Sequence, residues 1–401
     1  CPAESMDAED KLFILYTSGS TGKPKGIVHS TAGYMVYAQY SFENVFQYNK
    51  GDIYWCTADI GWITGHSYII YGPLLSGATT VMFEGVPTYP DAGRFWEIVE
   101  KNNINIFYTA PTAIRSLEAM GNDYVRKYNL NSLKVLGTVG EPINEDAWNW
   151  YFKEIGGNKA PIVDTWWQTE TGGIMISNLA GINKAKATFA TLPLPGIEAC
   201  VVDENGEEMK KNNIEGKLCI KFPWPSIART IYGDHQRFIN TYFSAFPGKY
   251  FSGDGCYKNK DGLFRITGRV DDVLIVSGHN LGTAEIESAI DEHENVCESA
   301  IVGYPHQIKG NGVFAYVICH HKPKDEKTIN IEINNLITRH VGPIAKVDKF
   351  LYVEGLPKTR SGKIMRRILR KIASQEYSNL GDTSTLLDPN VVENIILESK
   401  K

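Results

Sequence analysis

Tyr16-Thr-Ser-Gly-Ser-Thr-Gly-Lys-Pro-Lys-Gly26 directly follows Leu12–Tyr16, a short apolar run that predicts a β-strand. Its glycines, serines and threonines offer many N–H and O–H donors in a flexible loop, and Lys23 and Lys25 add positive charge. Such a loop suits a polyphosphate, whose oxyanions need many converging donors. The spacing differs from a Walker A motif, and Pro24 prevents a helix from starting directly after Lys23. We therefore predict a phosphate-binding loop of another kind; the alternative is an ordinary solvent-exposed turn.

Around this loop, β-rich apolar runs alternate with helix-like segments as far as Asp164. Two of the helices are expected at Arg94–Lys101 and Glu145–Ile155, the second with Asn144 as its N-cap and Gly156 just past its end. Strands alternating with helices predict an α/β fold with a parallel sheet, whose ligands sit beyond the carboxyl ends of the strands. The runs expected to be strands are Leu12–Tyr16, Asp52–Cys56, Thr79–Phe83, Ile104–Tyr108, Leu133–Val139 and Ile162–Val163.

The residue composition and the pattern of expected elements change twice after this region. Short strands with many glycines and prolines predict a small β-rich subdomain at about 193–267, inside a large domain that spans 1–270. After the charged turn Gly268–Asp272 the pattern restarts as a separate, mobile α+β domain at 271–401, with a polar tail after Tyr377 that we expect to be partly mobile. Its expected elements are helices at Ala284–His293, near Ile331–His340 and after Ser361, and strands at Ala300–Val302, Val313–Ile318 and Phe350–Val353.

Composition narrows the class of protein. A chain of 401 residues with 43% hydrophobic and 22% charged residues predicts a globular protein of two or more domains. The net charge of −5 argues against a dedicated nucleic-acid binder, and the seven scattered cysteines predict reduced thiols. No run approaches 18 apolar residues and the first residues lack a signal-peptide pattern, so we expect a cytoplasmic protein with no membrane partner. Without an initiator Met, the chain is expected to begin inside something larger.

Five further motifs follow the loop in a fixed order. They are Val139-Gly-Glu-Pro142, Asp164-Thr-Trp-Trp-Gln-Thr-Glu-Thr-Gly172, Tyr250-Phe-Ser-Gly-Asp-Gly255, Ile266-Thr-Gly-Arg-Val-Asp-Asp272 and Pro357-Lys-Thr-Arg-Ser-Gly-Lys363. Together with the loop, they resemble the signature of the adenylate-forming enzymes, which include acyl-CoA synthetases, firefly luciferase and peptide-synthetase adenylation domains. The resemblance covers nearly all of the chain. Trp62-Ile-Thr-Gly-His-Ser67 and the Trp-Trp-Gln-Thr-Glu-Thr run point, within the family, to AMP-forming acetyl-CoA synthetases.

This resemblance implies a site for ATP and Mg²⁺. Glu170 would hold the Mg²⁺, because a hard cation suits one carboxylate together with phosphate oxygens. Thr169 would contact the α-phosphate, and Asp254 and Arg269 would bind the ribose hydroxyls. Residues that would close over the phosphates are Thr17, Ser18, Gly19, Ser20, Thr21, Gly22, Lys23 and Lys25. Residues that would frame the adenine or adjoin it are Gly140, Glu141, Pro142, Asp164, Thr165, Trp166 and Gln168.

The resemblance also implies a small acyl pocket. Trp62, Ile63, Thr64, Val139 and Trp167 match the positions that line it. The Trp167 indole would fill the space that longer-chain relatives leave open, so acetate is the expected substrate and propionate a poorer one. The alternative is that Trp167 is an ordinary core aromatic.

A second half-reaction with coenzyme A (CoA) would use the other domain. Lys363 would reach the acetate carboxylate and the α-phosphate, where negative charge accumulates during adenylation. The domain would then rotate about the hinge residue Asp271, and the loop Ser277-Gly278 would enter to border the pantetheine tunnel. Arg339 is a candidate contact for a CoA phosphate. Acetylation of Lys363 would remove its charge and is a possible control.

Two departures from the family and three alternatives stay open. Relatives usually have Arg where this chain has Asn280, and they carry a long segment upstream of the loop, where this chain has only about fifteen residues. The alternatives are a propionyl-CoA or other short-chain acyl-CoA synthetase, and a truncated fragment that binds nucleotide without turnover. A nucleic-acid contact by the basic segment after Pro357 is disfavoured, since that segment lacks interleaved aromatics.

Overall fold

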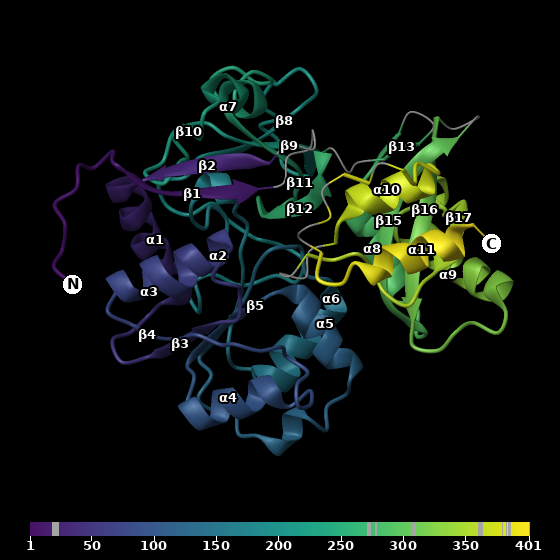
Figure 1. The fold of residues 1–401 in the computed structure, drawn as a ribbon, viewed down its shortest axis with the longest axis horizontal. Helices are drawn as coiled ribbons and strands as arrows, with labels where there is room; N and C mark the ends of the chain where they lie inside the picture. The colour runs from purple at the N-terminus through teal and green to yellow at the C-terminus, as the bar shows by residue number, and fades with distance from the viewer. Residues whose placement is uncertain are drawn as a thin grey trace. The chain divides into compact units, whose positions relative to one another are not determined.

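A computed structural model describes residues 1–17, 24–270, 274–276, 279–306, 310–359, 364–378, 380, 381, 383 and 386–400. The chain divides into two compact units, Cys1–Ile266 and Thr267–Lys401. Each unit has its own sheets and its own hydrophobic clusters, and both appear in Figure 1.

A five-stranded parallel sheet forms the centre of the first unit. Its strands are β3 (Ile53–Cys56), β4 (Thr79–Val81), β5 (Ile106–Thr109), β6 (Val135–Thr138) and β7 (Ile162–Asp164), in the order β4-β3-β5-β6-β7. Strands β5, β6 and β7 are buried and mostly apolar, as expected for a parallel sheet covered on both faces. This confirms the predicted α/β class.

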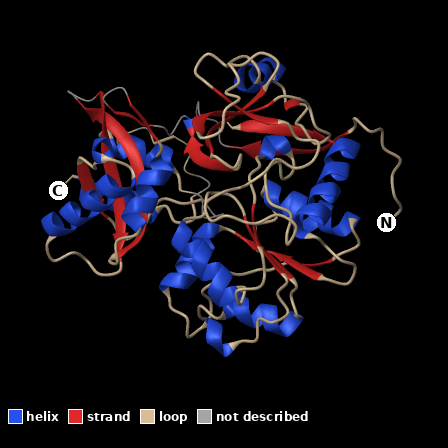
Figure 2. Ribbon diagram, turned by 180° about the vertical axis from the view of Figure 1, so that it is seen from behind, coloured by secondary structure: helices blue, strands red, loops and turns tan. Residues whose placement is uncertain are grey.

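Alternate residues of these strands enter two different hydrophobic clusters. Tyr54 and Tyr108 pack with Phe42 and Phe46 of helix α1, while Trp55 and Phe107 pack on the opposite face against the other helices. Figure 2 shows the helices around the strands. The helices of this part are α1 (Thr31–Phe46), α2 (Ile63–Gly65), the π-helical turn η1 (His66–Tyr71), α3 (Gly72–Leu75), α4 (Arg94–Asn102), α5 (Pro111–Ala119), the 3₁₀ turn η2 (Val125–Lys127), α6 (Glu145–Trp150) and the π-helical turn η3 (Tyr151–Ile155).

The first predicted strand lies outside the parallel sheet. β1 (Lys11–Thr17) pairs antiparallel with β2 (Lys25–Ser30), and β2 pairs antiparallel with β10 (Thr230–Ile231). The expectation that Leu12–Tyr16 belongs to the parallel sheet is therefore wrong. The phosphate motif joins β1 to β2 as a hairpin connection, and a connection this short cannot make the crossover that parallel neighbours require.

The predicted β-rich region forms a second, antiparallel sheet. Its strands are β8 (Ala199–Val202), β9 (Ile214–Ile220), β11 (Tyr250–Lys258) and β12 (Phe264–Arg269), in the order β12-β11-β9-β8. Helix α7 (His235–Tyr242) precedes β11, and its N-cap Asp234 accepts the backbone N–H of Arg237 at 3.0 Å. This sheet brings β11 next to the segment that follows β7, where the predicted site residues lie.

The second unit is α+β, as expected. Its sheet has the order β14-β13-β16-β15 with β17 parallel to β16; helices α8 and α9 cover one face and α10 and α11 the other. The tail after Tyr377 includes a helix, α11, whose Val392 and Ile395 are buried; the expectation of a mobile tail overlooked this apolar spacing. The elements are β13 (Leu274–Val276), β14 (His279–Leu281), α8 (Thr283–Asp291), β15 (Val296–His306), β16 (Gly310–Cys319), α9 (Glu326–His340), the 3₁₀ turn η6 (Pro343–Ala345), β17 (Lys349–Tyr352), α10 (Arg366–Ala373) and α11 (Asn390–Ser399).

Two smaller sequence expectations concern thiols and membranes. All seven cysteines lie in the described part of the chain and are free thiols. Within that same part, no helix is both long enough and apolar enough to cross a bilayer.

Candidate active site

Two predicted nucleotide segments meet at the carboxyl ends of β6 and β7. The Thr138 hydroxyl donates to Asp164 Oδ1 at 2.7 Å, and the Thr165 hydroxyl donates to the Thr138 carbonyl at 2.8 Å. Burial raises the pKa of Asp164 to about 6, although the hydrogen bond from Thr138 acts in the opposite direction. Because β6 and β7 are parallel neighbours, the loops that follow them leave the sheet at the same edge.

The loop after β6 is tied to helix α5. Arg115 Nη2 contacts Glu141 Oε1 at 2.7 Å, and the Thr112 hydroxyl donates to the same oxygen. Gly140 has a positive φ of 98° and open space beside its α-carbon. This conformation favours glycine, and the space leaves room for a flat ligand against the backbone.

The segment after β7 is held against β11 through Asp254. Trp166 Nε1 and Gln168 Nε2 both donate to Asp254 Oδ2, at 3.0 and 2.8 Å. Gln168 Nε2 also donates to the Ser252 carbonyl, and Tyr250 donates to Gln168 Oε1 at 2.8 Å. The buried Asp254 carboxylate is thus oriented by groups from the Trp-Trp-Gln motif, as a ligand for two ribose hydroxyls would need to be.

Glu170 lies at the centre of a buried polar triad. Lys25 Nζ is 3.3 Å from Glu170 Oε1 and donates to the Tyr242 hydroxyl at 2.6 Å, and this hydroxyl donates to Glu170 Oε1. Burial on its own raises the pKa of Glu170, but the charge of Lys25 and the hydrogen bond from Tyr242 outweigh it, so the pKa lies below its usual value. The carboxylate is therefore ionised, with the Lys25 ammonium as its counter-ion.

His29 on β2 fixes the backbone beside Glu170. His29 Nε2 is 2.7 Å from the carbonyl of Thr169, which can only accept, so Nε2 carries the proton. The side chain is fully buried, and this burial lowers its pKa to about 4. A neutral imidazole thus holds the start of the 3₁₀ turn η4 (Thr169–Thr171).

Gly172 ends that turn in a place that only glycine can occupy. Its φ is +73°, and a Cβ there would lie 2.7 Å from the Ser226 carbonyl oxygen. The Trp224 and Ser226 side chains donate to the Thr171 carbonyl at 2.9 and 2.6 Å. The Thr169–Gly172 segment is therefore fixed at both ends, which gives Glu170 a defined position.

Trp167, the central residue of the predicted acyl pocket, is held by two tyrosines. Its indole Nε1 donates to the Tyr108 hydroxyl at 3.3 Å, and its ring packs edge-to-face on Tyr68 at 4.9 Å. Trp167 packs against the cluster that contains Ile63 and also against the one that contains Val139. The flanking residues Trp62 and Thr64 are half-buried.

The residues present fit ATP and Mg²⁺. Among the described residues, the buried Thr17 hydroxyl at the start of the phosphate motif has no hydrogen-bond partner, as expected for a donor kept for a phosphate oxygen. Glu170 supplies the single carboxylate that suits Mg²⁺ bound together with phosphate oxygens. Thr17, Lys25, Asp254 and Glu170 are therefore the described groups that would hold the nucleotide and its metal.

Several predicted site residues lie outside the described part of the chain. They are Ser18, Gly19, Ser20, Thr21, Gly22, Lys23, Asp271, Ser277, Gly278 and Lys363. Arg269 and Arg339 are described and exposed, at the end of β12 and in the last turn of α9. Both belong to the second unit, and their approach to a nucleotide stays a prediction.

Among the residues that the motif analysis missed are His29, Tyr108, Arg115 and Tyr242. Tyr242 contacts Lys25 across 217 positions of sequence, so no local spacing could have indicated it. A signal for His29 existed, because it is a polar side chain in the apolar run of a strand, three residues after the phosphate motif.

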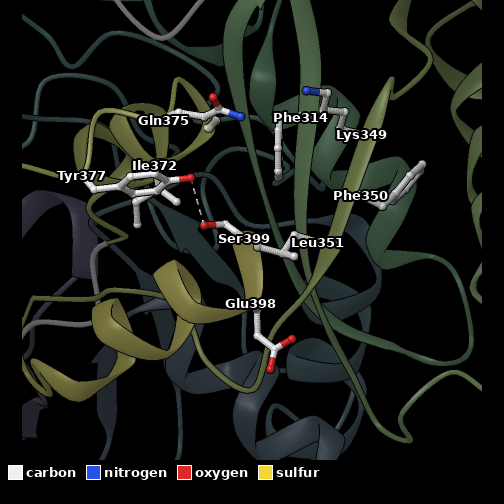
Figure 3. Close-up of a pocket in the computed structure, with 10 residues that line it drawn as sticks. Phe314, Lys349, Phe350, Leu351, Ile372, Gln375, Tyr377, Glu398 and Ser399 are labelled. Carbon is white, nitrogen blue, oxygen red and sulfur yellow. Dashed lines mark hydrogen bonds between the residues drawn. The ribbon is translucent and has the colours of Figure 1, made fainter. Parts of the chain in front are cut away.

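A hollow of about 290 Å³ lies in the second unit. Figure 3 shows its lining, which comes from β16, β17, α10, α11 and the segment between the two helices. Ser399 donates to the Tyr377 hydroxyl at 3.5 Å on one side of it. Its lining residues are Phe314, Lys349, Phe350, Leu351, Ile372, Ala373, Gln375, Tyr377, Glu398 and Ser399, and none of them is a predicted site residue.

Comparison with known proteins identifies similar sequences and folds. A family model described as AMP-binding enzyme matches residues 1–232, and one described as AMP-binding enzyme C-terminal domain matches residues 285–363. Acetyl-coenzyme A synthetase of Halorhodospira halophila is 59% identical over 398 residues, and that of Magnetococcus marinus is 57% identical over 396. Each alignment covers 99% of this chain and 61% of the relative, so the chain spans about three fifths of their length.

One solved structure extends the comparison to the fold. The crystal structure of the anthranilate CoA ligase AuaEII in complex with anthranoyl-AMP matches with a TM-score of 0.83 and 25% sequence identity. The match covers 94% of this chain and 70% of that one.

Proposed function

Because the chain belongs to the family of AMP-binding enzymes, we propose that it is an AMP-forming acetyl-CoA synthetase that activates acetate with ATP and passes the acetyl group to CoA. The observation that carries the proposal is a set of three hydrogen-bonded groups built on the segments that follow β6 and β7. They are Thr138 with Asp164, Trp166 and Gln168 with Asp254, and Lys25 and Tyr242 with Glu170. The identity of 57–59% to proteins named acetyl-coenzyme A synthetase supports acetate as the acid.

In the proposed first step an acetate oxygen attacks the α-phosphorus of ATP, and pyrophosphate leaves, giving acetyl-AMP. In the second step the CoA thiolate attacks the acetyl carbonyl, AMP leaves, and acetyl-CoA forms. No covalent bond to the protein is needed, so the protein's contribution is positioning and charge stabilisation. Bound Mg²⁺ would neutralise charge on the phosphate oxygens.

Each described residue has a positioning role in this proposal. Asp254 is oriented by Trp166 and Gln168 to accept the ribose hydroxyls, and Glu141 is fixed by Arg115 so that its loop forms one side of the adenine site. His29 holds the Thr169 backbone, and in this proposal the Thr169 hydroxyl would contact the α-phosphate. Lys363 would stabilise the charge that develops at the α-phosphate, and Asp271 would be the hinge between the two steps.

Substrate choice is proposed to depend on Trp167. Its indole is fixed by Tyr108 and Tyr68, so it cannot turn aside to admit a longer chain without losing these contacts. A methylene in a tight pocket is worth about 1–3 kcal/mol, or roughly 10–200-fold in specificity.

The experiment offers acetate, propionate and butyrate together with ATP, Mg²⁺ and CoA, and measures the acyl-CoA products by mass spectrometry. Acetyl-CoA should dominate for the unaltered chain, and Trp167→Ala should shift the products toward butyryl-CoA by about tenfold or more. Trp148→Ala, a change at a half-buried tryptophan on α6, is the control and should leave the product ratio unchanged. A majority of propionyl-CoA would instead support the propionate alternative.

The fragment alternative predicts a different result. A chain that binds nucleotide without turnover would bind ATP in equilibrium dialysis and release no pyrophosphate with any acid. This outcome would reject the acetyl-CoA synthetase proposal while keeping the nucleotide site.

Regulation and location complete the proposal. Acetylation of Lys363 would remove the charge that adenylation uses, so Lys363→Gln should lower acetyl-AMP formation while ATP still binds. A cytoplasmic location is proposed alongside, and cell fractionation would check it.

A further inference from the structure

The triad of Lys25, Tyr242 and Glu170 combines a residue predicted to bind phosphate with one predicted to bind metal. Lys25 is the first residue of β2 and the last lysine of the phosphate motif, whereas Glu170 lies in the turn after β7. Their side chains are only 13% and 11% exposed, so neither charge is screened by bulk water. The phosphate-binding role of Lys25 and the Mg²⁺-binding role of Glu170 therefore conflict, because the Lys25 ammonium occupies the position beside the carboxylate that Mg²⁺ would take.

Two members of the triad are fixed. The Thr169 carbonyl accepts from His29, and the Glu170 carbonyl accepts the backbone N–H of Ala228 at 2.9 Å, so the backbone is held on both sides of the carboxylate. Tyr242 is buried on α7, and its ring stacks on Tyr250 at 5.5 Å with an interplanar angle of 15°. Neither group can move far without breaking these contacts.

Lys25 is the member that can move. Its ammonium sits on a four-carbon stem with several rotatable bonds, and it is a point charge with no fixed planar geometry. It makes one 3.3 Å contact with the carboxylate, whereas its bond to Tyr242 is shorter, at 2.6 Å. A divalent cation on Glu170 would repel this ammonium across a few ångströms of poorly screened space.

From this geometry we propose that Lys25 acts as the counter-ion of Glu170 until Mg²⁺ arrives, and that Mg²⁺ displaces it toward the phosphates. Tyr242 is the positioning residue of this exchange, because its hydroxyl accepts from Lys25 and donates to Glu170. The exchange couples metal binding to engagement of the phosphate loop: Lys25 becomes available to phosphate only when the metal has replaced it. The assignment of Glu170 to Mg²⁺ rests on the proposed function, but the test does not require turnover.

The test adds Mg²⁺ alone, without nucleotide, and follows thermal unfolding at constant ionic strength. Mg²⁺ should raise the midpoint of the unaltered chain only at high concentration, because it must first displace Lys25 from Glu170. Lys25→Met removes the charge and keeps the apolar stem, so it should lower the midpoint, and Mg²⁺ should restore it. The Mg²⁺ concentration for half-restoration should be at least about tenfold below any concentration that affects the unaltered chain.

A matched control uses the other unit. Lys358 and Glu298 also form a buried pair, at 2.6 Å with 19% and 12% side-chain exposure. Lys358→Met should lower the midpoint too, yet Mg²⁺ should not restore it, because this pair has no proposed metal role. Equal restoration of both variants would show a non-specific ion effect and overturn the proposal.

A milder variant keeps the test decisive if Lys25→Met does not fold. Tyr242→Phe retains both charges and the stacked ring but removes the hydroxyl, so Mn²⁺ binding followed by electron paramagnetic resonance should tighten several-fold relative to the unaltered chain. Unchanged Mn²⁺ affinity would overturn the role of Tyr242. If Mg²⁺ restores the midpoint of Lys25→Met but the unaltered chain forms no acetyl-AMP, the exchange of Lys25 for Mg²⁺ stands and the proposed function is rejected. If the unaltered chain forms acetyl-AMP but Mg²⁺ does not restore the variant, the function stands and the exchange is rejected.

Discussion

Lys25–Glu170 in the first unit and Arg366–Glu287 in the second are both buried ion pairs. The two carboxylates have nearly the same side-chain exposure, 11% and 12%. The partners differ in shape, however. Arg366 donates through Nη2 to Glu287 Oε2 at 2.6 Å and through Nε to Oε1 at 3.2 Å, and the backbone N–H of Ile301 donates to Oε1 at 2.8 Å.

The difference separates a permanent ion pair from an exchangeable one. A planar guanidinium bound to both oxygens is fixed in direction, and the third donor ties Glu287 to β15, so this pair joins α8, α10 and the sheet. A single ammonium beside one oxygen of Glu170 can leave and be replaced. Burial alone does not distinguish these two cases; the number and geometry of the donors do.

The largest effect is expected at the exchangeable pair. Glu170→Gln removes the carboxylate proposed for Mg²⁺ and should lower acetate-dependent pyrophosphate exchange by about 100-fold or more. The change is isosteric, so circular dichroism should match that of the unaltered chain. A loss below about threefold would show that Glu170 is as purely structural as Glu287 and would end the comparison.

The next effect is expected in stability, at the permanent pair. Glu287→Gln leaves the Arg366 guanidinium without its counter-ion, and breaking such a pair typically costs about 3–5 kcal/mol. Because Arg366 is 22% exposed, water can partly solvate its unpaired charge. Urea unfolding should therefore show a loss of unfolding free energy near the lower end of this range. A change below 1 kcal/mol would mean that the bidentate geometry adds little.

A pH dependence should mark the surroundings of Glu170. The pKa of His29 lies at about 4 in the folded chain, below its unfolded value of 6.5, so its contribution to stability is full above pH 6.5 and is lost as the pH falls through 4. The shift corresponds to about 3 kcal/mol.

The matched variant for this measurement is His29→Gln, whose amide can still donate to the Thr169 carbonyl but cannot take up a proton. Urea unfolding at pH 7 and pH 4 should show a smaller loss for His29→Gln than for the unaltered chain, since the carboxylates of both titrate alike. Equal losses would contradict the assignment of a neutral, buried imidazole.

The smallest effect tests the shape of the cation directly. Arg366→Lys keeps the charge but loses one of the two parallel contacts with Glu287, so unfolding should become easier by about 1 kcal/mol, well below the effect of Glu287→Gln. If Arg366→Lys and Glu287→Gln lower the unfolding free energy equally, the bidentate geometry of the guanidinium, and not its charge alone, would be essential to the pair.

Local patterns predicted much of the fold, and the family resemblance named the candidate site. Alternating apolar runs indicated β3 to β7, because a buried parallel strand needs apolar residues on both faces. Glu141, Asp164 and Glu170 were instead named through the resemblance of their motifs to those of adenylate-forming enzymes, and their roles stay predictions. The pattern could not place β1, since its apolar run is compatible with either sheet and the pairing with β2 decides. Helix α11 was not predicted, because the polar residues that precede it led to the whole tail after Tyr377 being interpreted as partly mobile.

Long-range contacts set the limit for the site. Tyr242 reaches Glu170 only because α7 precedes β11 and packs beside it. Arg115 on α5 reaches Glu141 in the loop after β6, across 26 positions of sequence. Such contacts follow from tertiary packing, which no single motif encodes. His29 could have been found, because a histidine in a buried strand needs a partner for its N–H group.

The most direct test of the account is acetate-dependent exchange of labelled pyrophosphate into ATP by this chain, with Mg²⁺ and without CoA. The account predicts exchange that requires acetate and Mg²⁺, falls with propionate, falls further with butyrate, and is nearly abolished in Glu170→Gln. Absence of acetate-dependent exchange in a folded sample that binds ATP would contradict it, and the network around Glu170 would then be a nucleotide-binding site without adenylation.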